Sequence, residues 1–104
     1  MAQYDVRINP SRQTGQDIPY LVEVQSDALD MSRRRVVVPL VRQAVLRQVD
    51  QILNPAFEIR GEALVLMPLD IAAIPEAALG ETVISIKEES DRIIGALDLL
   101  LARA

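Results

Sequence analysis

The sequence contains no cysteine, no histidine and no tryptophan among its 104 residues. Without cysteine, the chain has no disulfide, no zinc–thiolate site and no cysteine nucleophile. Without histidine, it lacks the commonest general base near neutral pH, and a Ser-His-Asp triad cannot be built. The aromatic residues are Tyr4, Tyr20 and Phe57 alone. We therefore expect a core that is mostly aliphatic.

Long apolar runs and clustered glycines are also missing. No apolar run approaches the roughly 18 residues of a membrane-spanning helix, and the N-terminus lacks the basic-then-apolar pattern of a signal peptide. Gly15, Gly61, Gly80 and Gly95 are isolated from one another, so there is no glycine-rich phosphate loop. These absences predict a cytoplasmic protein with no membrane partner.

The residues that are present suit a small globular protein. Half of them are hydrophobic, and 104 residues are enough for one domain, residues 1–104, with one core. The net charge is −4 and the sequence pI is about 4.7. Because an acidic surface does not attract nucleic-acid backbone or anionic lipid, we expect no direct nucleic-acid partner.

Alternating and β-branched segments predict a mostly β chain. Pro39 falls inside the third predicted strand and favours an edge position or a bulge there. Gly61 marks a hairpin turn, and Pro75 ends the last predicted strand. Residues 41–53 have some helical spacing, and a short helix and an irregular segment are equally compatible with it. The predicted strands are residues 3–8, 18–25, 35–41, 55–59, 63–67 and 70–74, with a flexible, turn-rich loop at 9–17.

The C-terminal segment predicts a helix. Ser85-Ile86-Lys87-Glu88 fits a capping box, so the helix should begin near Ile86. Leu99 falls on the polar side of this helix, where it is either incidental or part of a contact. An apolar stripe at helical spacing is formed by Ile93, Ile94, Leu97, Leu100 and Leu101. Together the elements predict a small antiparallel sheet or barrel with one C-terminal helix.

A cluster of three arginines, Arg33, Arg34 and Arg35, is the most distinctive basic feature. Arginine offers a planar fork of donors that suits phosphate, but Asp27 and Asp30 lie within reach and would pair with these arginines. We favour a structural ion-pair hinge over an anion site. The carboxylates Glu58, Glu62 and Asp70 are interpreted as solvated surface in an acidic chain. No catalytic constellation stands out, so binding to another protein becomes the default function.

One stretch of the chain resembles the signature of the CcdB family, the toxins of type II toxin–antitoxin modules that poison DNA gyrase. It consists of Gln25-Ser26-Asp27, Leu29-Asp30, Arg34-Arg35 and Val37-Val38-Pro39-Leu40. The similarity continues in order at Pro55, Ile59, Met67, Asp70-Ile71-Ala72, Ile74-Pro75 and Gly80-Glu81. It covers nearly the whole chain and extends to the C-terminal helix with compatible spacing.

The resemblance implies a homodimer of SH3-like barrels of the CcdB/MazF/Kid type, each with a small accessory sheet and a C-terminal α-helix. It implies that residues 41–53 are mostly non-helical and that the arginines lead the chain into a core strand. It also implies a protein that is not an enzyme and that uses no cofactor and no metal. Instead, the paired C-terminal helices of such toxins enter the cavity of the DNA gyrase A dimer and trap the enzyme with cleaved DNA.

Two sets of binding residues follow from the resemblance. In the family, a C-terminal Trp-Gly-Ile makes the key gyrase contact, and this chain has Ala-Arg-Ala in its place. The positions that match gyrase contacts are Ala28, Leu29, Asp98, Leu101, Ala102, Arg103 and Ala104. A CcdA-like antitoxin would contact a loop made of Asn9, Pro10, Ser11, Arg12, Gln13, Thr14, Gly15, Gln16 and Asp17. Since this chain is acidic, the matching antitoxin segment should carry Arg or Lys.

Two alternatives remain open at this point. The chain could be a non-toxic or repurposed homologue that binds an antitoxin without poisoning gyrase. It could also be an endoribonuclease like MazF on the same barrel, because fold does not imply function. The acidic pI and the CcdB-type signature both count against RNA as a substrate.

Overall fold

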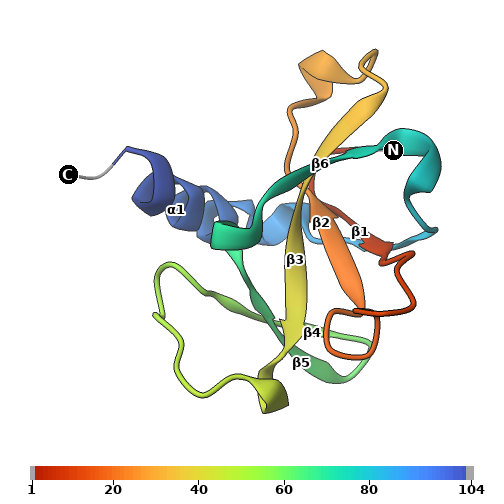
Figure 1. Ribbon diagram of the computed structural model, residues 1–104. Helices are drawn as coiled ribbons and strands as arrows, with labels where there is room; N and C mark the ends of the chain where they lie inside the picture. The colour runs from red at the N-terminus through yellow and green to blue at the C-terminus, as the bar shows by residue number, and fades with distance from the viewer. Residues whose placement is uncertain (1, 103–104) are drawn as a thin grey trace.

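The computed structural model describes residues 2–102, which form a curled antiparallel sheet with one α-helix beside it (Figure 1). Within these residues, seven strands share one sheet in the order β4-β5-β3-β2-β1-β7, and β6 pairs with β3. The strands are β1 (Asp5–Ile8), β2 (Tyr20–Glu23), β3 (Arg34–Arg42), β4 (Ala56–Ile59), β5 (Glu62–Leu66), β6 (Ala72–Pro75) and β7 (Thr82–Ser85). This confirms the expected fold class, mostly β and barrel-like with a C-terminal helix.

Short helical turns connect the strands. The 3-10 turns are η1 (Asp27–Leu29), η2 (Gln43–Val45), η3 (Pro68–Asp70), η4 (Glu76–Ala78) and η5 (Lys87–Glu89), and the α-helix is α1 (Ser90–Leu101). Residues 41–53 hold the last two residues of β3, then η2 and irregular backbone, so the mostly non-helical interpretation is confirmed. No helix within residues 2–102 is long and apolar enough to cross a membrane.

β3 is the central strand of the sheet. Its residues 37–40 pair with β2, while residues 34–37 pair with β6 and residues 40–42 pair with β5. The expected smaller sheet is therefore continuous with the main one, because β3 is long enough to pair with both. β3 lies inside the sheet and its register against β2 is continuous through Pro39, so the prediction of an edge position or a bulge there was wrong.

The sheet tolerates Pro39 because of where its missing N–H falls. Its carbonyl accepts a hydrogen bond from the N–H of Met67 (3.0 Å), just beyond β5. The amide and carbonyl of one strand residue point to the same side, so the missing N–H points into the gap between β6 and β5. Neither β5 nor β6 pairs with β3 at Pro39, so the missing N–H costs the sheet no ladder hydrogen bond.

The core lies between the curled sheet and α1. From β3, Val38 and Leu40 point into the core cluster, while Val37 and Val41 are buried on the opposite face, so β3 is buried on both faces. The cluster is mostly aliphatic, as expected. Its members are Tyr4, Val6, Val22, Val38, Leu40, Phe57, Ile59, Leu64, Leu66, Ile86, Ile93 and Ala96.

The strand predicted at residues 70–74 is shifted in the structure, where β6 runs from Ala72 to Pro75. Asp70 lies in η3, because Pro68 favours a helical first turn and the N–H of Asp70 bonds the carbonyl of Met67 (3.0 Å). Pro75 belongs to β6 as its last residue, opposite Arg34, where a missing amide interrupts no further pairing. The hairpin turn at Gly61 is confirmed.

The predicted start of the helix was also wrong. Ser85 ends β7, which the sequence did not indicate, and α1 begins at Ser90 after η5. The Ser85 hydroxyl accepts a hydrogen bond from the N–H of Lys87 (3.3 Å). The N–H of Ile86 bonds the carbonyl of Tyr4 (3.0 Å), and the Ile86 side chain is in the core. Pairing with β1 therefore keeps this segment on the sheet and overrides the local helix signal.

The buried face of α1 is narrower than the predicted stripe. Ile93 and Ala96 are fully buried, and Leu97 packs against the core. Ile94 is 49% exposed and Leu101 is 76% exposed, so both lie off the buried face. Leu99 and Leu100 are half-buried, which contradicts the placement of Leu99 on the polar side.

Candidate protein-binding site

Of the three clustered arginines, Arg33 and Arg34 are exposed and only Arg35 is buried. It is only 5% exposed. Its Nη2 donates to the carbonyl of Asp30 (2.8 Å) and its Nη1 to the carbonyl of Leu29 (3.3 Å). Its guanidinium also lies 3.4 Å from a carboxylate oxygen of Glu76. A buried arginine engaged in this way is a structural group and not an exposed anion site.

Arg35 belongs to a buried ladder of charges across three strands. Glu23 is 2% exposed, and its two carboxylate oxygens lie 3.2 Å from Arg7 Nη1 and 3.5 Å from Arg35 Nε. Arg7 also donates through Nε to the carbonyl of Gly80 (2.7 Å). The register explains the ladder, because β1, β2 and β3 bring these three side chains to one face as diagonal neighbours.

The ion-pair interpretation is thus confirmed for Arg35, but the predicted partners were wrong. Arg35 pairs with Glu23 and Glu76, and it bonds Asp30 through the backbone carbonyl. Asp27 instead accepts a hydrogen bond from the N–H of Gln3 (2.8 Å). Neither glutamate was a candidate from the sequence, because strand register and the return of η4 bring them together.

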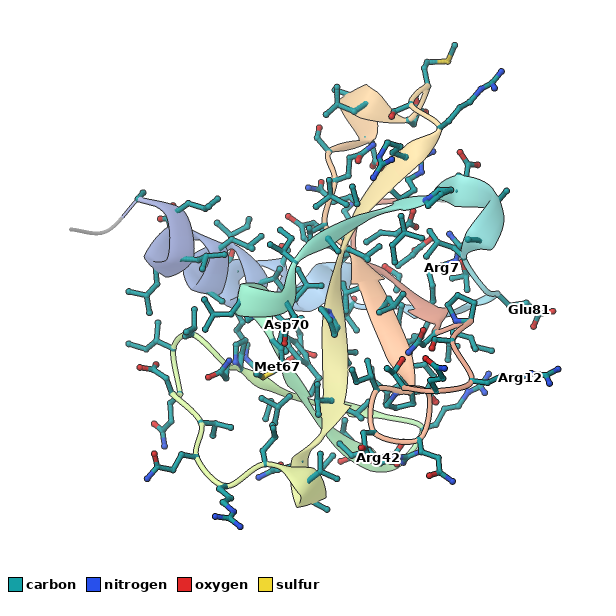
Figure 2. All side chains as sticks on the ribbon, in the orientation of Figure 1. Arg7, Arg12, Arg42, Met67, Asp70 and Glu81 are labelled. Carbon is teal, nitrogen blue, oxygen red and sulfur yellow. The ribbon has the colours of Figure 1, made fainter. Side chains whose placement is uncertain are left out.

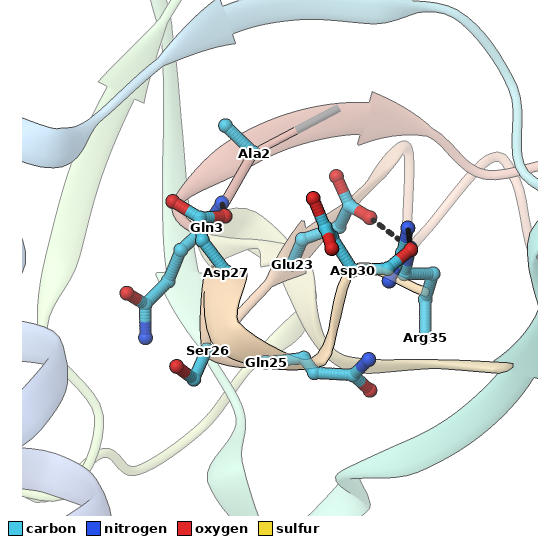
Figure 3. A pocket seen from close by; sticks show the side chains of 8 residues that line it. All are labelled: Ala2, Gln3, Glu23, Gln25, Ser26, Asp27, Asp30 and Arg35. Atoms are coloured by element: carbon cyan, nitrogen blue, oxygen red, sulfur yellow. Dashed lines mark hydrogen bonds and ion pairs between the residues drawn. The ribbon is translucent and has the colours of Figure 1, made fainter. Parts of the chain in front are cut away.

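The segment of residues 26–31, which we call the η1 tip, is held by polar side chains from inside. The Ser26 hydroxyl caps η1 by accepting from the N–H of Ala28 (3.1 Å). The Gln25 side chain donates to the carbonyl of Leu29 (3.1 Å) and accepts from the N–H of Val36 (3.0 Å). Figure 3 shows these groups around a cavity of only about 10 Å³, too small for an organic ligand.

The outer side of the η1 tip is apolar. Leu29 is 58% exposed and Met31 is 92% exposed. Ala28, the other residue matched to a gyrase contact, is also exposed. Solvent-facing Leu and Met side chains on a segment fixed from within are typical of a contact surface for another protein.

The second set of predicted contact residues lies on α1. Asp98, Leu101 and Ala102 are exposed at the C-terminal end of the helix, and Arg103 and Ala104 lie outside the described residues. Figure 1 places the η1 tip and this end of α1 at separate corners of the molecule. Within one chain, the fold therefore does not bring the two sets together.

The loop of residues 9–17 lies at yet another corner, near the end of β3 (Figures 1 and 2). It is a loop throughout, as predicted. Asn9 donates through Nδ2 to the carbonyl of Ile18 (2.7 Å) and to the hydroxyl of Thr14 (3.0 Å). The N–H of Arg42 bonds the carbonyl of Asp17 (2.8 Å), so the loop is closed at its base while Arg12 extends outward (Figure 2).

An apolar patch beside α1 was missed by the sequence analysis. Ile94 and Leu101 are seven residues apart, so they lie on one face of the helix, and α1 packs against η3, which carries Leu69 (68% exposed). Ile71 (37% exposed) follows η3 directly. We call Leu69, Ile71, Ile94 and Leu101 the α1 patch. The sequence did carry a signal for this patch. The apolar stripe of the helix is wider than the face that packs on the core, so part of it, including Ile94 and Leu101, had to remain exposed.

The three carboxylates singled out in the sequence, Glu58, Glu62 and Asp70, lie at or near the surface. Glu62 pairs with Arg42, and Glu58 is exposed on β4. The backbone N–H groups of Leu53 and Ile52 bond the exposed carboxylate of Asp50 and hold its pKa below the ordinary 3.8. Residues 2–102 hold no group of three or more carboxylates that could bind a metal ion.

A comparison with known protein families fits this geometry. The family model described as CcdB protein matches residues 3–102 of the chain. The match includes the η1 tip, the loop of residues 9–17 and all of α1.

Proposed function

The chain belongs to the CcdB family, which supports a toxin of a toxin–antitoxin module, and we propose that it acts by poisoning DNA gyrase. The observation that carries the proposal is the family match over residues 3–102, with the η1 tip and the end of α1 both exposed. In this mechanism the protein is not an enzyme. It binds the gyrase A dimer while the DNA is cleaved and prevents religation.

The proposal includes a homodimer. The α1 patch exposes four large apolar side chains over α1 and η3, and such a surface on a small protein is typical of an interface. Pairing two copies through this patch would bring both C-terminal helix ends close together.

The absence of tryptophan shapes the expected affinity. Aromatic anchors in interfaces commonly contribute about 2 kcal/mol or more when truncated. In this chain, Leu101 and Ala102 occupy the exposed helix end. We therefore expect weaker binding to gyrase than a tryptophan-bearing helix would give, with the η1 tip contributing a larger share.

The proposed antitoxin is a CcdA-like protein whose disordered segment folds onto the loop of residues 9–17. The loop is closed at its base by hydrogen bonds, and Arg12 extends outward from it (Figure 2), which suits a partner segment that folds on binding. With a net charge of −4 on the toxin, a basic segment would bind with an affinity that falls as salt is added.

A gyrase cleavage assay tests the function directly. Purified protein is incubated with gyrase, supercoiled DNA and ATP, and trapped cleavage complexes are counted as linear DNA after denaturation. We expect trapping by the wild-type protein and reduced trapping by Leu29→Asp, because Leu29 is exposed on the η1 tip and lies outside the α1 patch. Ile84→Asp is the matched control, because Ile84 is an exposed apolar residue on β7. No trapping by a folded wild-type protein would contradict the proposal.

One observation favours a second function. These 104 residues contain no tryptophan, which favours a homologue that binds an antitoxin without poisoning gyrase. The same assay separates the two functions. Tight antitoxin binding without trapping and without growth inhibition would support the second.

A further inference from the structure

The carbonyl of Leu29 is held by three donors. Gln25 Nε2 lies 3.1 Å from it, Arg35 Nη1 lies 3.3 Å from it, and the N–H of Ser32 lies 3.0 Å from it. Two of these donors are side chains from outside the η1 tip. The backbone at Leu29 is therefore fixed, while the Leu29 side chain is 58% exposed to solvent.

The arginine is itself fixed in direction. Glu23 and Glu76 flank its guanidinium at 3.5 and 3.4 Å, and its two Nη atoms reach two successive carbonyls, those of Leu29 and Asp30. A planar fork can bond two adjacent acceptors at once, whereas a point-charge donor cannot reproduce that geometry. Burying a charged side chain costs desolvation free energy. The hydrogen bonds of Arg35 to the η1 tip therefore indicate a role in holding the tip.

We infer that Arg35 and Gln25 are positioning residues, which set the conformation of the η1 tip in which Leu29 meets the target. This inference rests on the proposed function. An ordered contact segment avoids the entropy loss of ordering on binding. If either donor is lost, the tip samples other conformations and binds more weakly, although neither side chain touches the target.

The test compares Arg35→Met and Gln25→Glu with Arg7→Met. Gln25→Glu keeps an acceptor for the N–H of Val36, removes the donor to the carbonyl of Leu29 and adds one negative charge beside that carbonyl. Arg7 is the matched control, because it shares the buried Glu23 carboxylate but bonds Gly80 and not the tip. Arg7→Met therefore reproduces the disruption of the buried ladder without releasing the tip.

Two readouts are measured on each folded protein. The first is hydrogen exchange at the amide of Ser32, which bonds Leu29. The second is the protein concentration that gives half-maximal gyrase trapping. We expect Arg35→Met to accelerate exchange at Ser32 and to raise that concentration roughly tenfold, with Gln25→Glu raising it by about threefold. Arg7→Met should change neither the exchange rate nor the concentration by more than about twofold.

Each outcome decides the inference. Unchanged exchange at Ser32, or trapping that survives both tip variants, overturns it while leaving the proposed function intact. An equal loss of trapping in Arg7→Met overturns it too, because general stability would then explain the effect. If Arg35→Met does not fold, Gln25→Glu decides alone. No trapping by the wild-type protein refutes the proposed function and this inference together.

Discussion

Replacing Glu23 with glutamine is the sharpest test of the structural argument. The Glu23 carboxylate is 2% exposed and lies between the guanidinium groups of Arg7 and Arg35, which are 7% and 5% exposed. Glu23→Gln keeps the shape of the side chain and removes its charge. Two buried cations then face each other across a neutral amide, with only the half-exposed Glu76 left as a counter-charge for Arg35.

The expected loss of stability is large. Removing one partner of a buried ion pair costs about 3–5 kcal/mol, because the remaining charge stays buried without compensation. A domain of this size has a total free energy of unfolding of roughly 5–15 kcal/mol. With a slope of about 1–3 kcal/mol per molar urea, the unfolding midpoint should fall by at least about 1 M. The melting temperature should fall by more than about 12 °C.

Urea unfolding followed by circular dichroism measures this loss. Glu58→Gln is the matched control, because Glu58 is exposed on β4; it should change the free energy of unfolding by less than about 0.5 kcal/mol. If Glu23→Gln and Glu58→Gln unfold at the same urea concentration, the buried ladder does not stabilise the fold. The anchoring of Arg35 by Glu23 would then lose its physical basis.

Three further predictions concern the turn, the surface loop and the dimer. Gly61 has φ +77, so Gly61→Ala should destabilise the fold by about 1–2 kcal/mol. Gly95 lies in open space on α1, so Gly95→Ala should stabilise the fold by up to about 1 kcal/mol. Equal urea midpoints for the two variants would refute this reasoning. Because the pKa of Asp50 is lowered, the stabilisation that its carboxylate gives the loop should be complete above the ordinary pKa of 3.8 and should be lost as the pH falls through the folded-state pKa. An NMR titration midpoint at or above 3.8 for Asp50 would contradict this prediction. Sedimentation should find a wild-type dimer, a monomeric Ile94→Glu and a dimeric Ile84→Glu, since Ile84 is equally exposed but lies off the α1 patch; a dimeric Ile94→Glu would exclude this patch as the interface.

The hairpin and the existence of β3 as a buried strand were predictable because local chemistry decides them, whereas the central position of β3 was not. Gly61 supplies the positive φ of the turn between β4 and β5, and Arg60 joins it at φ +53. The β-branched run Val36-Val37-Val38 has few alternatives to a buried strand. The absence of cysteine and histidine excludes whole classes of chemistry through composition alone.

The helix start was not predictable for the opposite reason. Ser85 has both a local role in a capping box and a non-local role opposite Asp5 on β1. The non-local pairing wins, because it adds ladder hydrogen bonds and buries Ile86. Similarly, Pro39 is unsuitable for a central strand by every local rule, and only the change of partner from β6 to β5 makes it acceptable.

The sequence alone determined the fold class, the aliphatic core and the family resemblance, since these depend on composition, periodicity and ordered motifs along the chain. The tertiary structure alone decided which charges meet. Arg35 lies only five residues from Asp30, yet its carboxylate partners are Glu23 and Glu76, which reach it across strands and from η4. Contacts between distant segments depend on strand register and on the sheet's curl, and neither is written in the spacing of residues along the chain.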